Sequence, residues 1–205
     1  HTRFLIDNNI LGSIDIEGDY QTAERIDRVY HAPSITSSDL FPKLKVISLD
    51  TETGKESGNL FCIGLSGEGY EKTFMVTEQK MKNVISCKDE EECLQKFRNE
   101  IIAQDPDIIT GWNIIDFDLE YLKGLMKKHK IPFDIGRTNE QVRLRIESGF
   151  FKSSSADIPG RQVLDAMNMI KDPFIKEAPS IKNAEFESYA LEDVSQALLG
   201  KGKLI

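Results

Sequence analysis

The sequence predicts a mixed α/β fold in which three antiparallel strands are followed by parallel βα units. Three segments, residues 44–50, 60–66 and 70–76, have the short length and apolar content of strands. The turn signals Ser57-Gly58-Asn59 and Gly67-Glu68-Gly69 separate them. Strands joined by short turns usually pair with their neighbours in the chain, so we expect an antiparallel meander.

A helix and a βα unit are expected after the meander. Apolar residues such as Cys93 and Phe97 recur at helical spacing through residues 89–104. Residues 107–110 then form a short apolar strand that runs into a glycine turn, and residues 117–129 show a second helical pattern. Strands that alternate with helices are typical of a parallel sheet.

The C-terminal part is less regular. Residues 146–163 predict a hairpin, and residues 161–164 are expected to lead into a helix near Asp165, whose carboxylate suits an N-cap. A fourth acidic group near a metal is the alternative interpretation of Asp165. Residues 172–186 contain two prolines and indicate a loop before a last helix over residues 187–199.

The N-terminal part shows little periodicity. We expect residues 8–40 to form a partly irregular segment that packs against the rest of the chain. The polar cluster at residues 34–38 indicates a boundary, which divides the chain into residues 1–40 and residues 41–205.

The composition is that of an ordinary globular protein. Hydrophobic residues make up 40% and charged residues 29% of 205 residues, enough for one large domain. No stretch of about eighteen apolar residues and no signal-peptide pattern is present, so no membrane association is predicted. Three cysteines without CxxC spacing indicate reduced thiols, with Cys62 in the core. These features favour a cytoplasmic location.

The net charge bears on possible partners. A formal charge of −8 is unfavourable for nucleic-acid contact, because lysine and arginine normally supply the phosphate contacts. Bound divalent cations would offset part of this charge. A local basic cluster follows the glycine turn, although such a run is more often a solvated helix face. The cluster consists of Lys123, Lys127, Lys128 and Lys130.

Candidate catalytic residues stand at the end of the first predicted strand. Asp50 and Glu52 are two positions apart, so their side chains would project from the same face of that strand. Paired carboxylates are costly unless a cation is present, and hard ions such as Mg²⁺ or Mn²⁺ prefer oxygen ligands. Such ions commonly catalyse phosphodiester cleavage. A solvated strand end with two acidic residues is the alternative.

A further acidic residue, Asp118, is predicted at a helix start after the turn that contains Trp112 and Asn113. Asn113 suits either a substrate contact or turn-capping. Phe117 and Trp112 flank apolar positions and favour core packing, with base stacking as the alternative.

These segments resemble the first two exonuclease motifs of family B DNA polymerases. Residues 48–53 contain the Asp-x-Glu of the first motif, and residues 111–118 contain the Asn, spacer, aromatic residue and Asp of the second. The resemblance covers almost the whole chain and is greatest to archaeal family B polymerases and bacterial DNA polymerase II. The other matching segments are Arg3–Asn8, Asp105–Ile109, Ile135–Arg137, Gly160-Arg161 with Asp165, Leu191–Val194 and Leu198–Lys201.

The resemblance implies a ribonuclease H-like fold and the 3′-5′ proofreading exonuclease activity of a DNA-directed DNA polymerase. In this interpretation Asp50, Glu52 and Asp118 bind two divalent metal ions, Mg²⁺ or Mn²⁺, about 3.5 to 4 Å apart. One ion would activate a water and the other would stabilise the leaving 3′ oxygen, so that one nucleotide is lost per cycle.

The resemblance also implies the substrate contacts and the partners. Thr51, Asn113 and Phe117 would lie near the substrate, which is DNA with a single-stranded or frayed 3′ end. The remaining polymerase domains and a sliding clamp would be protein partners in DNA replication. The location would be the nucleoid region of an archaeal or bacterial cytoplasm.

One match to the family is deceptive. Tyr189 and Asp193 have the Tyr-x-x-x-Asp spacing of the third exonuclease motif. In the family, however, this stretch begins a helix that ends at Leu-Gly-x-x-Lys, and the third motif lies further downstream. We therefore expect Tyr189 and Asp193 to be helix residues. Residues 41–205 are accordingly interpreted as an exonuclease domain truncated before its third motif, and residues 1–40 as a remnant of the polymerase N-terminal domain and linker.

Two other functions stay open. A family B relative with a decayed site would be a structural nucleic-acid-binding module, although all three carboxylates are retained. A phosphoesterase acting on small substrates could use the same kind of sheet. The three scattered histidines have no zinc-binding spacing, and the sequence contains neither a P-loop nor a nucleophile elbow.

Overall fold

The computed structural model describes residues 2–54, 58–147 and 154–202. The chain divides into two compact units, His1–Leu44 and Lys45–Ile205, each of which has its own secondary structure. Within the described residues, no helix is long and apolar enough to cross a membrane.

The N-terminal unit is more regular than predicted. It begins with helix α1 and continues with four strands, which form two antiparallel pairs, β1 with β4 and β2 with β3. Each strand has four or five residues, most of them exposed, so no hydrophobic alternation marks it in the sequence. The expectation of a partly irregular segment over residues 8–40 therefore holds only for the turns and loops between these strands. The elements are α1 (Thr2–Asp7), β1 (Ile14–Glu17), β2 (Tyr20–Ala23), β3 (Ile26–Tyr30) and β4 (Ser34–Ser37).

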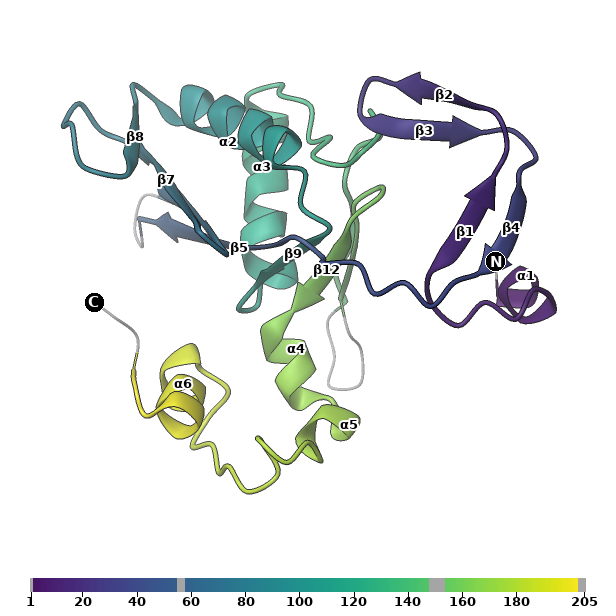
Figure 1. The fold of residues 1–205 in the computed structure, drawn as a ribbon. Coiled ribbons are helices and arrows are strands. Elements are labelled where there is room, and N and C mark those ends of the chain that lie inside the picture. The colour runs from purple at the N-terminus through teal and green to yellow at the C-terminus, as the bar shows by residue number, and fades with distance from the viewer. Residues whose placement is uncertain (1, 55–57, 148–153, 203–205) are drawn as a thin grey trace. The chain divides into compact units, whose positions relative to one another are not determined.

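The second unit is built on a six-stranded mixed sheet with the strand order β12-β9-β5-β6-β7-β8 (Figure 1). Strand β6 pairs antiparallel with both β5 and β7, whereas β9, β12 and β8 pair in parallel with their neighbours. The expected meander followed by parallel βα units is confirmed. The strands are β5 (Val46–Thr53), β6 (Leu60–Gly67), β7 (Tyr70–Val76), β8 (Val84–Cys87), β9 (Ile108–Gly111) and β12 (Gln162–Asp165).

Two edge strands of this sheet were not predicted. The four residues of β8 follow a polar loop, and their pattern is too short to separate from that loop. Residues 161–164 lead into helix α4 (Ala166–Lys171), as expected, but Gln162–Asp165 also forms strand β12 beside β9, which was not predicted. Pairing with β9 determines the strand conformation of residues 162–165, because a segment of four residues has no strong strand preference of its own.

Helix α2 (Glu90–Gln104) confirms the helix expected over residues 89–104. Asp89 is its N-cap, and the Asp89 carboxylate accepts a hydrogen bond of 2.8 Å from the backbone N–H of Glu92. Three acidic residues in the first turn suit the positive end of the helix dipole. The helix ends at Asp105, which adopts a left-handed conformation.

The helix expected over residues 117–129 begins earlier and in an unusual form. A π-helical turn, η1 (Ile115–Leu119), precedes the regular helix α3 (Glu120–Lys128). In this turn the N–H of Leu119 donates to the carbonyl of Ile114, five residues back, over 2.8 Å. A π-turn is rare and is often found at functional sites.

The hydrophobic core lies between the sheet and the two helices α2 and α3, which Figure 1 shows beside one another. Ile47 and Leu49 of β5 are almost completely buried, as are Phe97 of α2 and Leu122 of α3. Burial of each such side chain stabilises the fold by about 1.5–3 kcal/mol.

The ends of α2 and α3 are joined by ionic contacts. Glu90 accepts hydrogen bonds of 2.7 Å from Lys128 and from His129, at the end of α3.

The cysteines differ from the expectation. All three are free thiols, but Cys87 and Cys93 are buried, whereas Cys62 is only half-buried. Cys62 lies opposite Glu52 in the β5–β6 pair, on the less covered face of the sheet. The prediction of a core position for Cys62 was therefore wrong.

The hairpin expected over residues 146–163 starts earlier in the chain. Strands β10 (Arg143–Arg145) and β11 (Ser155–Asp157) form an antiparallel pair. Residues 148–153, where part of the expected hairpin falls, lie outside the described residues.

The C-terminal helices follow β12. Asp165 accepts a hydrogen bond of 3.1 Å from the N–H of Asn168, which confirms the predicted N-cap of the first of them. The last helix begins at Leu191 rather than at residue 187, so Tyr189 precedes it, while Asp193 is inside its first turn. The three helices are α4 (Ala166–Lys171), α5 (Pro173–Lys176) and α6 (Leu191–Leu199).

Candidate functional site

Strand β5 separates its acidic residues from its apolar ones. The residues of β5 alternate between exposed and buried along most of the strand, so Asp50 and Glu52 share the exposed face. Thr51 points into the interior and is only 4% exposed. The shared face expected from the Asp-x-Glu spacing is present in the structure.

The π-turn brings Asp118 to the buried side of the same strand. Asp118 is 1% exposed, and its Oδ1 atom accepts two hydrogen bonds from Thr51. The Thr51 backbone N–H donates over 2.8 Å and the Thr51 hydroxyl over 2.7 Å. Asp118 lies 67 positions after Thr51 in the sequence but contacts it directly, between Asp50 and Glu52.

The environment of Asp118 opposes its ionisation. Burial and, to a smaller extent, the charge of Asp50 raise the pKa of the Asp118 carboxyl, the hydrogen bonds from Thr51 lower it, and the net result is a raised pKa of about 6. Asp50 is thus close enough to act electrostatically on Asp118. Two carboxylates in such proximity favour binding of a cation, because a cation removes their mutual repulsion.

The thiol of Cys62, on the paired strand β6, is affected by the charges of Asp50 and Glu52. Burial raises the pKa of the Cys62 thiol, and the charges of Glu52 and Asp50 raise it as well. A thiol with a raised pKa is a poor nucleophile at neutral pH. Cys62 therefore borders the acidic pair without the properties of a reactive cysteine.

Gly111 allows the turn before Asp118 to approach β5. A Cβ atom at Gly111 would lie 2.5 Å from the carbonyl oxygen of Leu49 and 3.1 Å from the Cβ of Ile114. Asn113 follows with a φ of 56°, the left-handed region that asparagine tolerates better than most residues. The Asn113 carbonyl accepts the N–H of Phe117 over 3.1 Å, which starts the helical turn.

Asp165, at the end of the neighbouring strand β12, supports this turn. Its Oδ2 atom accepts a hydrogen bond of 3.2 Å from the N–H of Ile115, while its Oδ1 atom caps α4. The sequence predicted only the cap. No local pattern indicates the second bond, because residues 115 and 165 become neighbours only when β12 pairs with β9.

The three residues expected near the substrate differ in exposure. Phe117 is 48% exposed, so its predicted core position was wrong and its ring is accessible. Asn113 and Trp112 are half-buried. Thr51 is buried and donates its hydroxyl hydrogen bond to Asp118.

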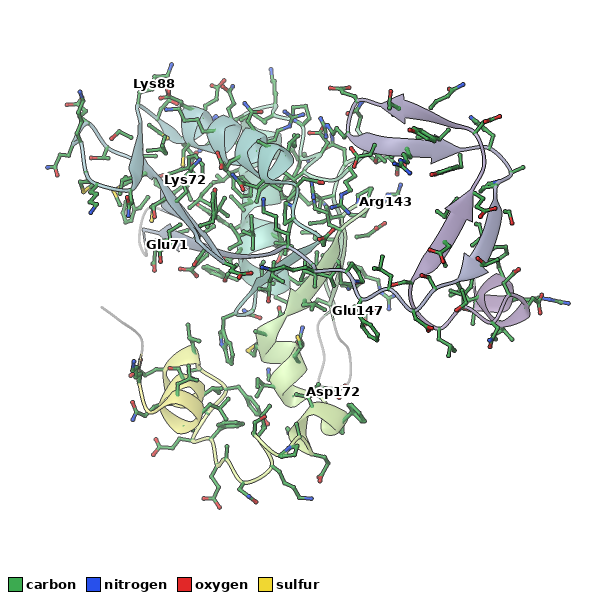
Figure 2. All side chains as sticks on the ribbon, in the orientation of Figure 1. Glu71, Lys72, Lys88, Arg143, Glu147 and Asp172 are labelled. Carbon is green, nitrogen blue, oxygen red and sulfur yellow. The ribbon has the colours of Figure 1, made fainter. Side chains whose placement is uncertain are left out.

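An open depression borders Asp50. It has a volume of about 360 Å³, and Asp50 lies in its lining with Ser48. Glu71 and Lys72, which are labelled on β7 in Figure 2, contribute to the same lining. Asp50 is therefore accessible from a polar hollow on the sheet.

The side chains of the site are of a type that can hold a metal ion. Within residues 2–54, 58–147 and 154–202, no group of three or more histidine, cysteine, aspartate or glutamate side chains is arranged to hold one. The available donors near Asp118 are carboxylate oxygens, which suit Mg²⁺ or Mn²⁺. In the same turn, Asp116 Oδ1 is buried and finds no hydrogen-bond partner among the described groups. Such an oxygen is costly unless a water or a cation satisfies it. The carboxylate oxygens of Asp50, Glu52 and Asp118 are donors of the type that a hard divalent cation prefers.

The basic cluster after the second motif is a solvated helix face. Lys123, Lys127, Lys128 and Lys130 are all exposed. Lys128 additionally forms an ion pair with Glu90 at 2.7 Å.

Comparison with protein families gives a match over residues 59–194 to the family "DNA polymerase family B, exonuclease domain". Among curated relatives, DNA polymerase II of Escherichia coli is 30% identical over 99% of this chain and 25% of its own length. A DNA polymerase of Archaeoglobus fulgidus is 27% identical over 93% of this chain and 23% of its own. The chain thus spans about a quarter of the length of these relatives.

A solved structure has the same fold. The family B DNA polymerase of the hyperthermophilic archaeon Pyrobaculum calidifontis superposes with a TM-score of 0.66, over 95% of this chain and 24% of that one, at 18% sequence identity. The mixed sheet with its helices is therefore a ribonuclease H-like exonuclease fold.

Proposed function

Because the chain belongs to the exonuclease-domain family of the family B DNA polymerases, we propose that it is the 3′-5′ proofreading exonuclease part of such a polymerase. Its substrate would be the single-stranded or frayed 3′ end of DNA. The observation that carries the proposal is the contact of Asp118 with Thr51, between Asp50 and Glu52. Two acidic motifs far apart in the sequence are thereby joined at one point of the sheet.

The proposed ligands of two divalent ions are Asp50, Glu52 and Asp118. The ions, Mg²⁺ or Mn²⁺, would supply the activation of a water and the stabilisation of the leaving 3′ oxygen. The role of the chain is to hold negatively charged oxygens where the cations bind. The exposed face of β5 admits DNA to Asp50 and Glu52, and the buried Asp118 fixes the inner side of the site.

Substrate contacts would come from the residues around the second motif. The exposed ring of Phe117 is available for stacking on an unpaired base, an interaction of about 1–3 kcal/mol per base. Asn113, in its left-handed turn, would contact the terminal nucleotide. Thr51, the third residue assigned to the substrate from the sequence, donates its hydroxyl to Asp118, so we propose no nucleotide contact for it.

The wider context of the domain is also a proposal. Residues 41–205 would be the exonuclease domain and residues 1–40 part of the N-terminal domain and linker, with the third motif outside these 205 residues. The α6 position of Asp193, which accepts a hydrogen bond from Ser188, supports this assignment over a catalytic role for Asp193. The other polymerase domains and a sliding clamp would be partners in DNA synthesis, in the cytoplasm near the nucleoid.

The test is 3′-5′ degradation of 5′-labelled single-stranded DNA with Mg²⁺ or Mn²⁺. We expect a ladder of products shortened by one nucleotide at a time, from this chain or from a longer form that carries a third motif. Asp50→Ala should abolish the ladder. Glu71→Ala, which removes an exposed carboxylate from the lining of the same depression, is the matched control and should leave it intact.

A decayed, structural exonuclease module is the second candidate. The absence of a three-residue metal group among the described residues favours it. Binding of single-stranded DNA without degradation in any form of the protein, with either metal, would refute the catalytic proposal and support this one.

A further inference from the structure

We propose that the Thr51 hydroxyl is a positioning group that fixes the Asp118 carboxylate for metal binding. This inference rests on the proposed function, because it takes Asp118 as a metal ligand. Thr51 occupies the position between Asp50 and Glu52, and its side chain points to the opposite face of β5.

The geometry of the contact supports a positioning role. Both donors of Thr51 reach the same atom, Asp118 Oδ1, over 2.8 Å from the backbone N–H and 2.7 Å from the hydroxyl. Two donors from one residue restrict rotation of the carboxylate about its terminal bond. The carboxylate that would hold a metal ion is thereby kept in one orientation. Hydrogen-bonded partners of ligating carboxylates orient them in this way.

The hydroxyl contribution is specific to the threonine side chain. Any residue except proline would offer the backbone N–H at position 51, whereas the second bond comes from the threonine hydroxyl. Burial of a carboxylate is unfavourable unless hydrogen bonds compensate for the lost water. With Asp118 at 1% exposure, the protein has to supply those bonds.

A direct role of Thr51 in substrate binding is disfavoured. The side chain is 4% exposed, and the hydroxyl hydrogen is donated to Asp118. Thr51 would therefore act on the reaction only through Asp118, and its removal should affect metal affinity before it affects DNA affinity.

Two substitutions separate positioning from packing. Thr51→Val keeps the size and branching of the side chain but removes the hydroxyl. Thr51→Ser keeps the hydroxyl but removes a buried methyl group. The two readouts are the dissociation constant of Mn²⁺, measured by electron paramagnetic resonance on the full chain without DNA, and the thermal unfolding midpoint without metal.

We expect Thr51→Val to weaken Mn²⁺ binding by about tenfold, since loss of partners that orient metal ligands typically costs 10–100-fold. Thr51→Ser should bind Mn²⁺ within about twofold of the unchanged chain, even though the lost methyl lowers its unfolding midpoint. Mn²⁺ affinity would then depend on the presence of the hydroxyl and not on the unfolding midpoint. A purely structural role of Thr51 predicts the opposite.

Other outcomes overturn the inference. If Thr51→Val binds Mn²⁺ as well as the unchanged chain does, or if affinity follows the unfolding midpoints, the hydroxyl has no positioning role while the proposed function stands. If the unchanged chain and Asp118→Asn bind Mn²⁺ equally weakly, Asp118 is no metal ligand, and both proposals fail.

Discussion

Replacement of Asp165 tests how the turn that carries Asp118 is supported. The side chain is 4% exposed and accepts two backbone hydrogen bonds, from Ile115 in the π-turn and from Asn168 in α4. Asp165→Ala removes both acceptors, whereas Asp165→Asn retains one carbonyl oxygen, which suffices for the cap of α4. The two variants therefore differ in their support of the π-turn and of the helix.

The magnitude follows from the two lost bonds. Loss of an N-cap costs about 1 kcal/mol, and a buried N–H without an acceptor costs about 1–3 kcal/mol. For Asp165→Ala we expect the free energy of unfolding to fall by about 2–4 kcal/mol. At about 2–4 °C per kcal/mol for a chain of this size, the unfolding midpoint should fall by roughly 5–15 °C. Asp165→Asn should lose roughly half as much.

The assay is urea or thermal unfolding followed by tryptophan fluorescence. Trp112 is the single tryptophan and lies three positions before Ile115, so it reports on the turn in question. Asp172→Ala is the matched control, because exposed Asp172 (Figure 2) caps only the four-residue helix α5. If Asp165→Ala lowers the free energy of unfolding no more than Asp172→Ala does, Asp165 does not stabilise both the π-turn and α4.

Three further predictions concern the same unit. Gly111→Ala should destabilise the fold and abolish exonuclease activity, because its Cβ would lie 2.5 Å from a carbonyl oxygen of β5; unchanged activity would contradict this. Gly124→Ala should stabilise the fold by about 0.5–1 kcal/mol in urea unfolding, since the exposed glycine lies inside α3 with open space around it. Burial raises the pKa of Glu90, but hydrogen bonds from Lys128 and His129 outweigh it, so the net pKa is lowered. The resulting stabilisation is present above about pH 4.5 and is lost as the pH falls through the lowered pKa. In Glu90→Gln the thermal unfolding midpoint should therefore fall less steeply with decreasing pH below about 4.5 than in the unchanged chain. An equally steep fall in both proteins would contradict the prediction.

The central elements of the fold could be predicted from the sequence because each carries its own signal. The alternation in β5, the glycine turns around β6 and the capped helix α2 are local patterns that survive in the structure. The strands β8 and β12 could not be predicted, because four residues gain strand geometry only from a neighbouring strand. The π-turn had no signal either, since it depends on the contact of residue 118 with β5.

The candidate site was predictable to a similar extent. Spacing alone placed Asp50 and Glu52 on one face, and the motif placed Asp118 near a helix start. The exposure of Phe117 and the two hydrogen bonds of Thr51 depend on the rotation of the π-turn. The core position predicted for Phe117 was wrong because a π-turn contains one residue more than an α-helical turn, which changes the side chains that face the interior.

The most direct measurement is a crystal structure of the protein grown with Mn²⁺, in which anomalous scattering locates the metal. We expect manganese ligated by carboxylate oxygens of Asp50 and Asp118, with Glu52 as a further ligand, beside the hydrogen bonds from Thr51. Absence of manganese at these carboxylates at saturating Mn²⁺, or manganese bound only elsewhere, would contradict the assignment of a proofreading site to them.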